Sequence, residues 1–378
     1  MKQIQSKAYN VTEDIVGKVT FNKHLLRHRS DYILVGKEYE CAKRGFAATI
    51  TTKKDIKELG KAICIVENIV EFNEGDIISI DEFGEIKFLY EIQSVHNAVF
   101  VTEKCNHRCI MCPQPPILEE KDKTEFNLKL ISLFDKKTAN IGITGGEPTM
   151  IGDKLFEIIH QIKKYCPKAS IGILSNGVKF SNFEYALKLA KCNTSDLQVD
   201  VPLFSDIAEE HNRIVGAKTF YKSIKGLYNL AQLGVNVAIR VVVHKQTYKR
   251  LPRLADYIYH NMPFVSQVAF MQMETTGLAE QNINDLWIDP YDYNKELEEA
   301  ISYLSARSIP AYIYNAQLCL LPQSLHSVAM QSITDWKDGF LDECDNCILK
   351  ENCAGVFKTN GQHLSKHIQS VTEHSIRE

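Results

Sequence analysis

The pattern of apolar and polar positions divides the chain into three stretches, of which the first ends near residue 96. In this stretch short runs rich in β-branched residues, such as AICIVENIV, EGDIISID and IKFLYEI, are separated by turn signals that include Gly75 and Gly84. Short strands joined by tight turns predict a small β-rich N-terminal domain with the form of a partial barrel. By default such a domain is a packing module.

From about residue 97 to 285 the pattern alternates between strands and helices. Strand runs such as NIGIT, SIGILS and NVAIRVVVH are separated by segments with helical spacing, such as KLFEIIHQIKKY. Strands connected by helices of this length indicate βαβ units and a parallel sheet. We count six strands, too few for a closed eight-stranded barrel, so the predicted fold is α/β with an open, partial (β/α)6 TIM-like barrel.

Beyond residue 286 the regularity fades. PYDYNKELEEAISYLSARS predicts one amphipathic helix, and the remainder is rich in loops and carries four cysteines. A segment with so little apolar content gains folding free energy from a bound metal. The predicted domains are therefore 1–96, 97–285 and 286–378.

Composition narrows the class of protein. A chain of 378 residues with a net charge of −3 offers no general attraction for nucleic acid or membrane surfaces. Its first residues lack the apolar core of a signal peptide, which predicts a cytoplasmic location. Eleven cysteines are many for a reducing compartment. Four are scattered and predicted to be small buried residues: Cys41, Cys64, Cys166 and Cys192. The grouped cysteines suggest metal.

The first group has the spacing C-x3-C-x2-C, formed by Cys105, Cys109 and Cys112, directly after the first strand of the βα region. Three thiolates on one short loop can bind three irons of a 4Fe–4S cube and leave the fourth iron free for a small chelator. Active sites of α/β proteins lie at this end of the strands. The alternative is a zinc knuckle with His107 as the fourth ligand.

Three further features follow later strands of the same region. GGEPT places Gly145, Gly146, Glu147 and Pro148 after the second strand, where glycines admit close approach of a ligand and the carboxylate can accept from an ammonium group; a simple tight turn is the alternative. SNG brings Ser175 and Asn176 to the end of the third strand, as a ribose contact or a turn.

A buried charge within a strand needs a partner, and Arg240 lies inside NVAIRVVVH. A ligand carboxylate and a neighbouring acid such as Asp200 are equally good candidates.

The spacing C-x3-C-x2-C after the first strand, together with GGEP one βα unit later, resembles the radical S-adenosylmethionine (SAM) enzymes. The resemblance implies that the open iron chelates SAM, and that one electron from the cluster cleaves SAM to a 5′-deoxyadenosyl radical. It implies that GGEP holds the amino group, that SNG contacts the ribose, and that Arg240 is a candidate for the carboxylate. Met111 stands where this family often has an aromatic residue, and a thioether can also pack against adenine.

The second cysteine group consists of Cys319, Cys344, Cys347 and Cys353, enough thiolates to close a cluster. It resembles a shortened SPASM/Twitch extension, because Phe357 occupies the position of its last cysteine, and it implies one auxiliary 4Fe–4S cluster. A structural zinc is the alternative.

CIMCPQPP and the run from NAQLCLL to DECDNC resemble the His-Xaa-Ser system radical SAM maturases of the HxsC type. This resemblance implies a small His-Xaa-Ser repeat precursor peptide as the substrate. It also implies a second radical SAM protein as a partner and an electron donor such as flavodoxin or ferredoxin. A radical SAM dehydrogenase acting on a small molecule and a non-catalytic metal-binding protein remain as alternatives.

Overall fold

The computed structural model describes residues 2–37, 45–54, 62–117, 119–192, 196–331, 338–361 and 363–372. It forms two compact units. One comprises residues 1–100, 122–143 and 157–170, and the other comprises residues 101–121, 144–156 and 171–378. The domain boundaries predicted at residues 97 and 286 are not tested by this division into two units and stay predictions. Cys41 lies outside the described residues.

The N-terminal region of the first unit is built on an eight-stranded sheet with the order β1-β8-β7-β3-β4-β5-β6-β2. Its strands are β1 (Gln3–Gln5), β2 (Lys7–Tyr9), β3 (Ile15–Thr20), β4 (Tyr32–Val35), β5 (Ala48–Thr51), β6 (Ile63–Ile65), β7 (Ile77–Ile80) and β8 (Glu85–Tyr90). Only Ser6 separates β1 from β2, which lie at opposite ends of this order, so the sheet curls until its two edges meet. Its centre is filled by fully buried side chains that include Ile33, Ile50 and Ile86. This arrangement supports the predicted partial barrel, although AICIVENIV is a strand only over Ile63–Ile65.

The second sheet also has eight strands, and they follow one another in chain order. They are β9 (His96–Phe100), β10 (Asn140–Thr144), β11 (Ser170–Leu174), β12 (Leu197–Pro202), β13 (Asn236–Val243), β14 (Val268–Gln272), β15 (Ala311–Tyr314) and β16 (Ala329–Met330). From β11 to β16 each neighbouring pair is parallel. The α/β fold with a curled, parallel half-barrel sheet is thus confirmed. Two strands exceed the six predicted, because β15 and β16 are too short to show a period.

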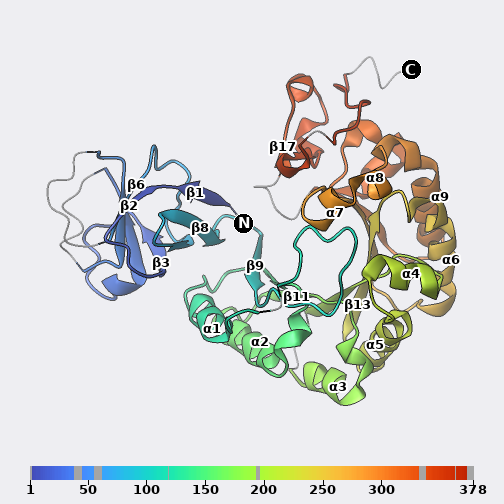
Figure 1. Cartoon of the computed structure of the whole chain (residues 1–378), viewed down its shortest axis with the longest axis horizontal. Helices are drawn as coiled ribbons and strands as arrows, with labels where there is room; N and C mark the ends of the chain where they lie inside the picture. Colours follow the sequence, from blue (N-terminus) through green and yellow to red (C-terminus); the bar gives the residue numbers. More distant parts are fainter. Residues whose placement is uncertain are drawn as a thin grey trace. The chain divides into compact units, whose positions relative to one another are not determined.

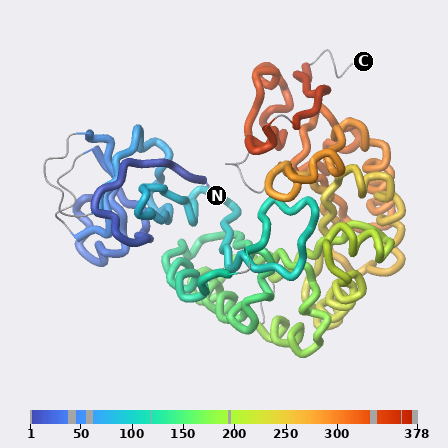
Figure 2. Tube along the Cα trace, viewed as in Figure 1, coloured from blue at the N-terminus to red at the C-terminus, as the bar shows by residue number. Residues whose placement is uncertain are grey.

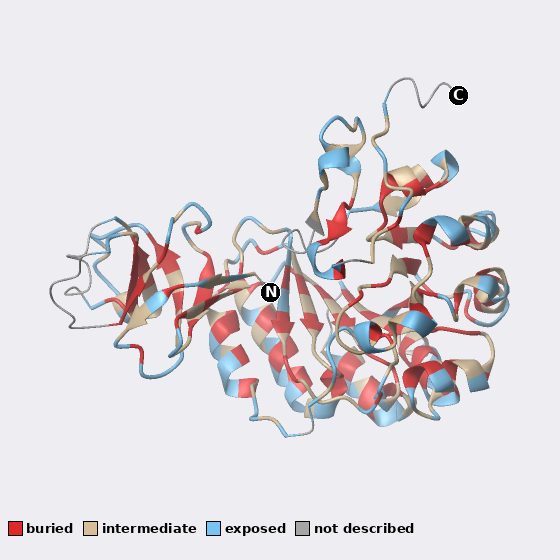
Figure 3. Cartoon of the chain, turned by 45° about the horizontal axis from the view of Figure 1, so that its top comes forward, coloured by how far each residue is buried: buried red, intermediate tan, exposed pale blue. Residues whose placement is uncertain are grey.

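The described helices connect these strands. They are α1 (Thr124–Ser132), α2 (Lys154–Tyr165), α3 (Phe183–Lys191), α4 (Ala208–Val215), α5 (Phe220–Gln232), α6 (Leu251–Asn261), α7 (Leu278–Gln281), α8 (Ile283–Leu286) and α9 (Asn294–Ser305). Within the second unit, α5, α6 and α9 lie on the outer side of the curved sheet (Figure 1). The strands are largely buried, and the helices turn buried faces toward them and exposed faces to solvent (Figure 3).

The two faces of the second sheet differ in chemistry. Val199 and Val201 of β12 are fully buried, whereas Asp200 between them is half-buried on the opposite face. Arg240 of β13 pairs in register with Pro202 and therefore shares the face of Asp200. The face turned away from the helices is thus the polar one.

No helix among the described residues combines the length and apolar character needed to cross a membrane.

Candidate active site

The first cysteine group lies on the loop between β9 and α1, and all three thiols are half-buried. The loop is fixed through its backbone. The amides of Arg108 and Ile110 donate to the carbonyls of Val215 and Ile214 at the end of α4, both at 3.0 Å. Helix α4, which the sequence did not predict, therefore supplies one wall for the loop.

The glycine pair after β10 supplies a second wall. The amide of Gly146 donates to the Thr102 carbonyl at 2.7 Å, and the amide of Glu147 donates to the Lys104 carbonyl at 2.8 Å. A Cβ atom built on Gly146 would lie 2.4 Å from the Lys104 carbonyl oxygen, and one on Gly145 would lie 2.4 Å from that of Thr102. The two glycines were expected to leave room for a ligand, but the space beside them is occupied by the backbone that leads into the cysteine loop.

Glu147 is buried, with 1% of its surface exposed. One carboxylate oxygen accepts from the amide and the hydroxyl of Thr149 (3.0 and 2.6 Å) and from the hydroxyl of Ser175 (2.8 Å). The other oxygen accepts from the amide of Asn176 at 2.6 Å. Burial raises the pKa of Glu147, while these hydrogen bonds act in the opposite direction. Glu147 therefore joins the turn after β10 to the turn after β11, and its predicted contact with an ammonium group stays a prediction.

The turn after β11 reaches the cysteine loop directly. The side-chain amide of Asn176 donates to the Oδ1 of Asn106 at 2.6 Å, and Asn106 lies between the first two cysteines. Asn106 and Thr149 were not predicted as site residues. Thr149 closes the motif GGEPT, so its place in the motif was the available signal. Pro148 is buried and begins a short 3-10 helix, Pro148–Ile151, which orients the Thr149 amide toward the carboxylate.

Met111 is buried in an apolar cluster with residues that include Phe204, Ile214 and Met273. Its side chain is therefore held beside the ends of α4 and β14, and its contact with adenine stays a prediction. His107 is also buried, and its Nε2 lies 2.9 Å from the hydroxyl of Thr219. Because this ring nitrogen already has a partner, the zinc-knuckle alternative is weakened.

Arg240 contacts the neighbouring strand through its guanidinium. Its Nε and Nη2 donate to the Sδ of Met271 at 3.3 and 3.0 Å. Burial lowers the pKa of Arg240, and the negative charge of Asp200 raises it; burial likewise raises the pKa of Asp200, and Arg240 opposes that effect. The two charges therefore influence each other, while Asp200 and a ligand carboxylate both stay predictions as the partner of Arg240.

The donor set of the first cysteine group fits a metal cluster. Burial raises the pKa of Cys105 to about 11 and that of Cys109 to about 12, and it also raises the pKa of Cys112. The charges of Cys112 and Cys105 also raise the pKa of Cys109. A thiolate is the form that binds metal. Thiols with these pKa values become thiolates when a cation offsets the burial.

Residues 99–258, which include this loop and both turns, match the family model of the radical SAM superfamily. These residues form a radical SAM domain. GTP 3′,8-cyclase of Alkaliphilus oremlandii is 24% identical over 235 residues, which cover 61% of this chain and 72% of the cyclase. Human molybdenum cofactor biosynthesis protein 1 is 30% identical over 170 residues, which cover 43% of this chain and 25% of the human protein.

A solved structure agrees at the level of the fold. Native anSMEcpe with bound AdoMet and the Kp18Cys peptide aligns with a TM-score of 0.51 at 14% identity, covering 75% of this chain and 94% of that one. A radical SAM domain implies a 4Fe–4S cluster and SAM as cofactors.

The four C-terminal cysteines lie in the same unit as the radical SAM domain's cysteine loop. Burial raises the pKa of Cys319, and the charges of Cys353, Cys344 and Cys347 raise it further, so the four thiols are near enough to influence one another. Backbone amides point at the sulfurs: those of Leu318 and Gly355 donate to Cys353, and that of Val371 donates to Cys347, all at 3.4 Å.

Amide hydrogen bonds to sulfur are a feature of cysteines that hold iron–sulfur clusters, where they tune the cluster. The donor set thus fits the predicted auxiliary group. Across the described ranges, no three His, Cys, Asp or Glu side chains converge as they do around a single metal ion.

Proposed function

We propose that this radical SAM enzyme modifies a ribosomally synthesised peptide of the His-Xaa-Ser type. The observation that carries the proposal is the presence, in one compact unit, of a three-thiol loop and a separate set of four thiols. When bound, a three-cysteine 4Fe–4S cluster supplies the electron that cleaves SAM, and the resulting radical abstracts hydrogen from the substrate. The second set of four thiols would hold one auxiliary cluster, which would supply an electron acceptor for the substrate.

The chain's own residues hold the reacting groups in place. Glu147 fixes the turns that carry Ser175 and Asn176, and Asn176 fixes the cysteine loop through Asn106. These contacts position the two predicted SAM-binding turns against the three thiols before any ligand binds. A site that is organised in advance loses less free energy when the ligand binds.

The polar face of the sheet is the proposed substrate side. Asp200 and Arg240 lie on this face in neighbouring strands, and Tyr314 of β15 interacts electrostatically with both. A face with an acid, a guanidinium and a phenol can hydrogen-bond the polar side chains of a peptide. The proposed partners are the precursor peptide, a second radical SAM protein and an electron donor such as flavodoxin or ferredoxin.

A small-molecule substrate is the second candidate. The relative from Alkaliphilus oremlandii is named for the cyclisation of GTP, and the human relative for molybdenum cofactor biosynthesis. The same polar face of the sheet can hydrogen-bond a nucleotide as readily as a peptide.

The two candidates are separated by one anaerobic experiment. Reconstituted enzyme is given SAM and dithionite, alone, with a His-Xaa-Ser repeat peptide, or with GTP, and 5′-deoxyadenosine is quantified. The peptide proposal expects more 5′-deoxyadenosine and a changed peptide mass in the peptide arm. A response to GTP without any change in the peptide would replace it with the second candidate.

A further inference from the structure

The segment that follows β14 contacts the loop of the first cysteine group and a turn that is close in the chain to the second group. At one end, the amide of Leu278 donates to the Cys112 carbonyl at 2.8 Å. The preceding residue, Gly277, approaches so closely that a Cβ atom there would lie 2.4 Å from the Pro113 carbonyl oxygen. The tube view shows this segment, in orange, beside the teal cysteine loop (Figure 2). Residues 273–278 therefore bear directly on the first group.

The other end of the segment is bound to the C-terminal region by a buried pair. The amide of Thr275 donates to the Oδ1 of Asn360 at 3.1 Å, and the Thr275 hydroxyl donates to the Oδ1 and the backbone carbonyl of Asn360 at 3.1 and 3.2 Å. Thr275 is 5% exposed and Asn360 is 3% exposed, although they lie 85 residues apart in the chain. Hydrogen bonds at such depth favour one arrangement, because any other leaves polar groups unpaired.

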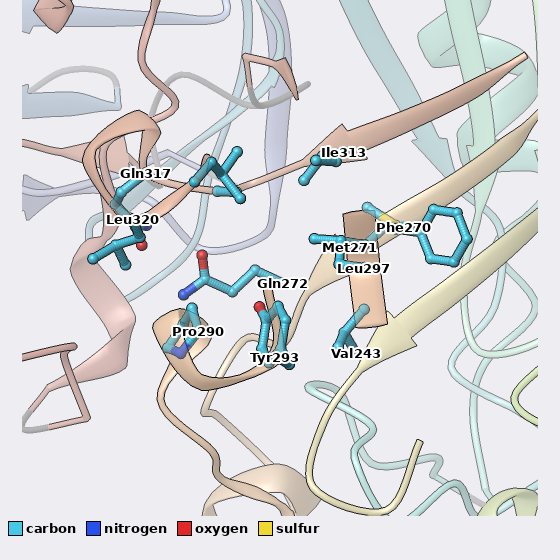
Figure 4. Close-up of a pocket in the computed structure, with 12 residues that line it drawn as sticks. Val243, Phe270, Met271, Gln272, Pro290, Tyr293, Leu297, Ile313, Gln317 and Leu320 are labelled. Carbon is cyan, nitrogen blue, oxygen red and sulfur yellow. The ribbon is translucent and has the colours of Figure 1, made fainter. Parts of the chain in front are cut away.

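Asn360 is close in the chain to the second cysteine group. It ends the 3-10 helix Lys358–Asn360, which directly follows the strand Val356–Phe357, and Cys353 precedes that strand. The same turn is fixed on its other side, because the Gln317 side chain donates to the Gly355 carbonyl at 2.6 Å. Gln317 in turn lies two residues before Cys319 and lines a pocket into which Gln272, at the end of β14, projects (Figure 4).

We propose that Thr275 and Asn360 are positioning residues that set the spacing between the two cysteine groups. This inference rests on the proposed function, in which both groups hold clusters. The pair touches neither group, and it acts through Leu278 on the loop of Cys112 and through the Lys358–Asn360 turn on the segment of Cys353. A shift of about 1 Å in such an arrangement is enough to reduce the rate about a hundredfold.

The test compares Thr275→Val with Thr275→Ser in the full chain. Valine keeps the shape but removes the hydroxyl, whereas serine keeps it. Hydrogen exchange is measured in the reconstituted protein over residues 338–361 and over residues 101–117. Valine should speed exchange at 338–361 about tenfold, because a buried acceptor loses its donor, and should leave 101–117 unchanged. Serine should match the parent. Asn360→Leu, which removes the side-chain acceptor of two of the bonds, should have an effect of about a hundredfold.

A second measurement is made on the reconstituted proteins. The magnetic coupling between the two reduced clusters reports their separation, and the valine variant should show a broadened or displaced distance with unchanged iron content and SAM cleavage. In the valine variant, the amount of substrate modified for each 5′-deoxyadenosine formed should fall. In the serine variant this ratio should equal that of the parent. Two results would overturn the positioning role. One is that the parent, Thr275→Val and Asn360→Leu proteins exchange at the same rate over residues 338–361, and the other is an unchanged distance between the clusters. Half the expected iron in the parent would instead overturn the proposed function, while the exchange data still decide whether the contact exists.

Discussion

The two cysteine groups are held in different ways. The loop of Cys105, Cys109 and Cys112 is fixed by backbone hydrogen bonds to the turn after β10, the end of α4 and the start of α7. The segment with Cys344, Cys347 and Cys353 consists of single 3-10 turns and two-residue strands, and the amides of Gly355 and Val371 donate to the sulfurs of Cys353 and Cys347. The first group is ordered by the fold around it.

This difference indicates which interactions order each of the two sites. Backbone contacts with a packed barrel persist without metal, so the first site is expected to be formed before its cluster binds. The second segment has only single 3-10 turns and two-residue strands, so its order depends more on what its sulfurs bind. Loss of metal should therefore disturb the second group far more than the first.

The largest effect should follow from replacing one thiol of the first group. Cys109→Ala removes one of three proposed iron ligands, so formation of 5′-deoxyadenosine from SAM with dithionite should fall to background. The matched control is Cys192→Ala, because Cys192 is a half-buried cysteine at the end of α3. Full SAM cleavage by the Cys109→Ala protein would show that the loop does not hold the cluster that acts on SAM.

Replacing a thiol of the second group should separate the two sites. Cys344→Ala should lower the iron content of reconstituted protein from about eight to about four atoms per chain, since each cluster holds four. Hydrogen exchange should rise over residues 338–361 and stay unchanged over residues 101–117, because only the former depends on metal for its order. Four irons together with one zinc in the parent protein would instead identify the second group as a structural zinc site.

A pair of glycines tests how tightly the fold holds the first loop. Gly277 (φ 64°, ψ −125°) and Gly152 (φ 67°, ψ −135°) have nearly the same backbone conformation, which glycine adopts readily and which would strain a residue with a Cβ atom. A Cβ atom on Gly277 would meet Pro113, whereas one on Gly152 would meet nothing within 4 Å. Gly152→Ala should cost about 2 kcal/mol of unfolding free energy through strain alone, and Gly277→Ala about 4 kcal/mol, because overpacking is added. Chemical denaturation measures both, and equal losses would show that the loop yields easily.

The strongly periodic elements could be predicted from the sequence. NIGIT and KLFEIIHQIKKY are the strand β10 and the helix α2 with the predicted bounds, because each has a clear apolar period over its whole length. Helix α4, AEEHNRIV, was missed because its polar residues outnumber its apolar ones, and it is stabilised by packing. Cys64 and Cys166 are buried as predicted, while Cys192 is only half-buried, so that prediction was wrong.

The candidate site could be predicted only in its residue types. Spacing showed which cysteines belong together, but the hydrogen bonds of Glu147 to Ser175 and Asn176 depend on β10 and β11 being neighbours in the sheet. The contact between Thr275 and Asn360 spans 85 residues and has no local signal at all. Contacts of this kind follow from the fold, and no periodicity in the chain records them.

The smallest effect concerns acid, which should act on both regions through buried histidines. His211 of α4, whose end supports the first loop, and His244, which lines a cavity with Asn360, have pKa values lowered by burial to about 4 and about 3. The Nδ1 of each accepts a backbone amide, from Phe204 and from Gln246, so protonation there breaks a hydrogen bond and buries a charge.

An unfolded histidine takes up its proton near pH 6.5, and these two take it up only at much lower pH while the chain is folded. Between those values the unfolded state binds more protons, so the free energy of unfolding falls as the pH falls. From pH 6.5 to pH 5 each histidine should remove about 2 kcal/mol. Denaturation at pH 7, 6 and 5 measures this loss.

His211→Asn and His244→Asn keep an acceptor for the amide. In each variant, the number of protons taken up on unfolding in acid should be smaller by one than in the parent. The regional prediction is sharper: after correction for the slower intrinsic exchange in acid, the protection of residues 338–361 against exchange should fall in the parent and fall less in the His244→Asn protein. If both variants kept the parent's full pH dependence, the acid sensitivity would have to come from groups other than these two histidines.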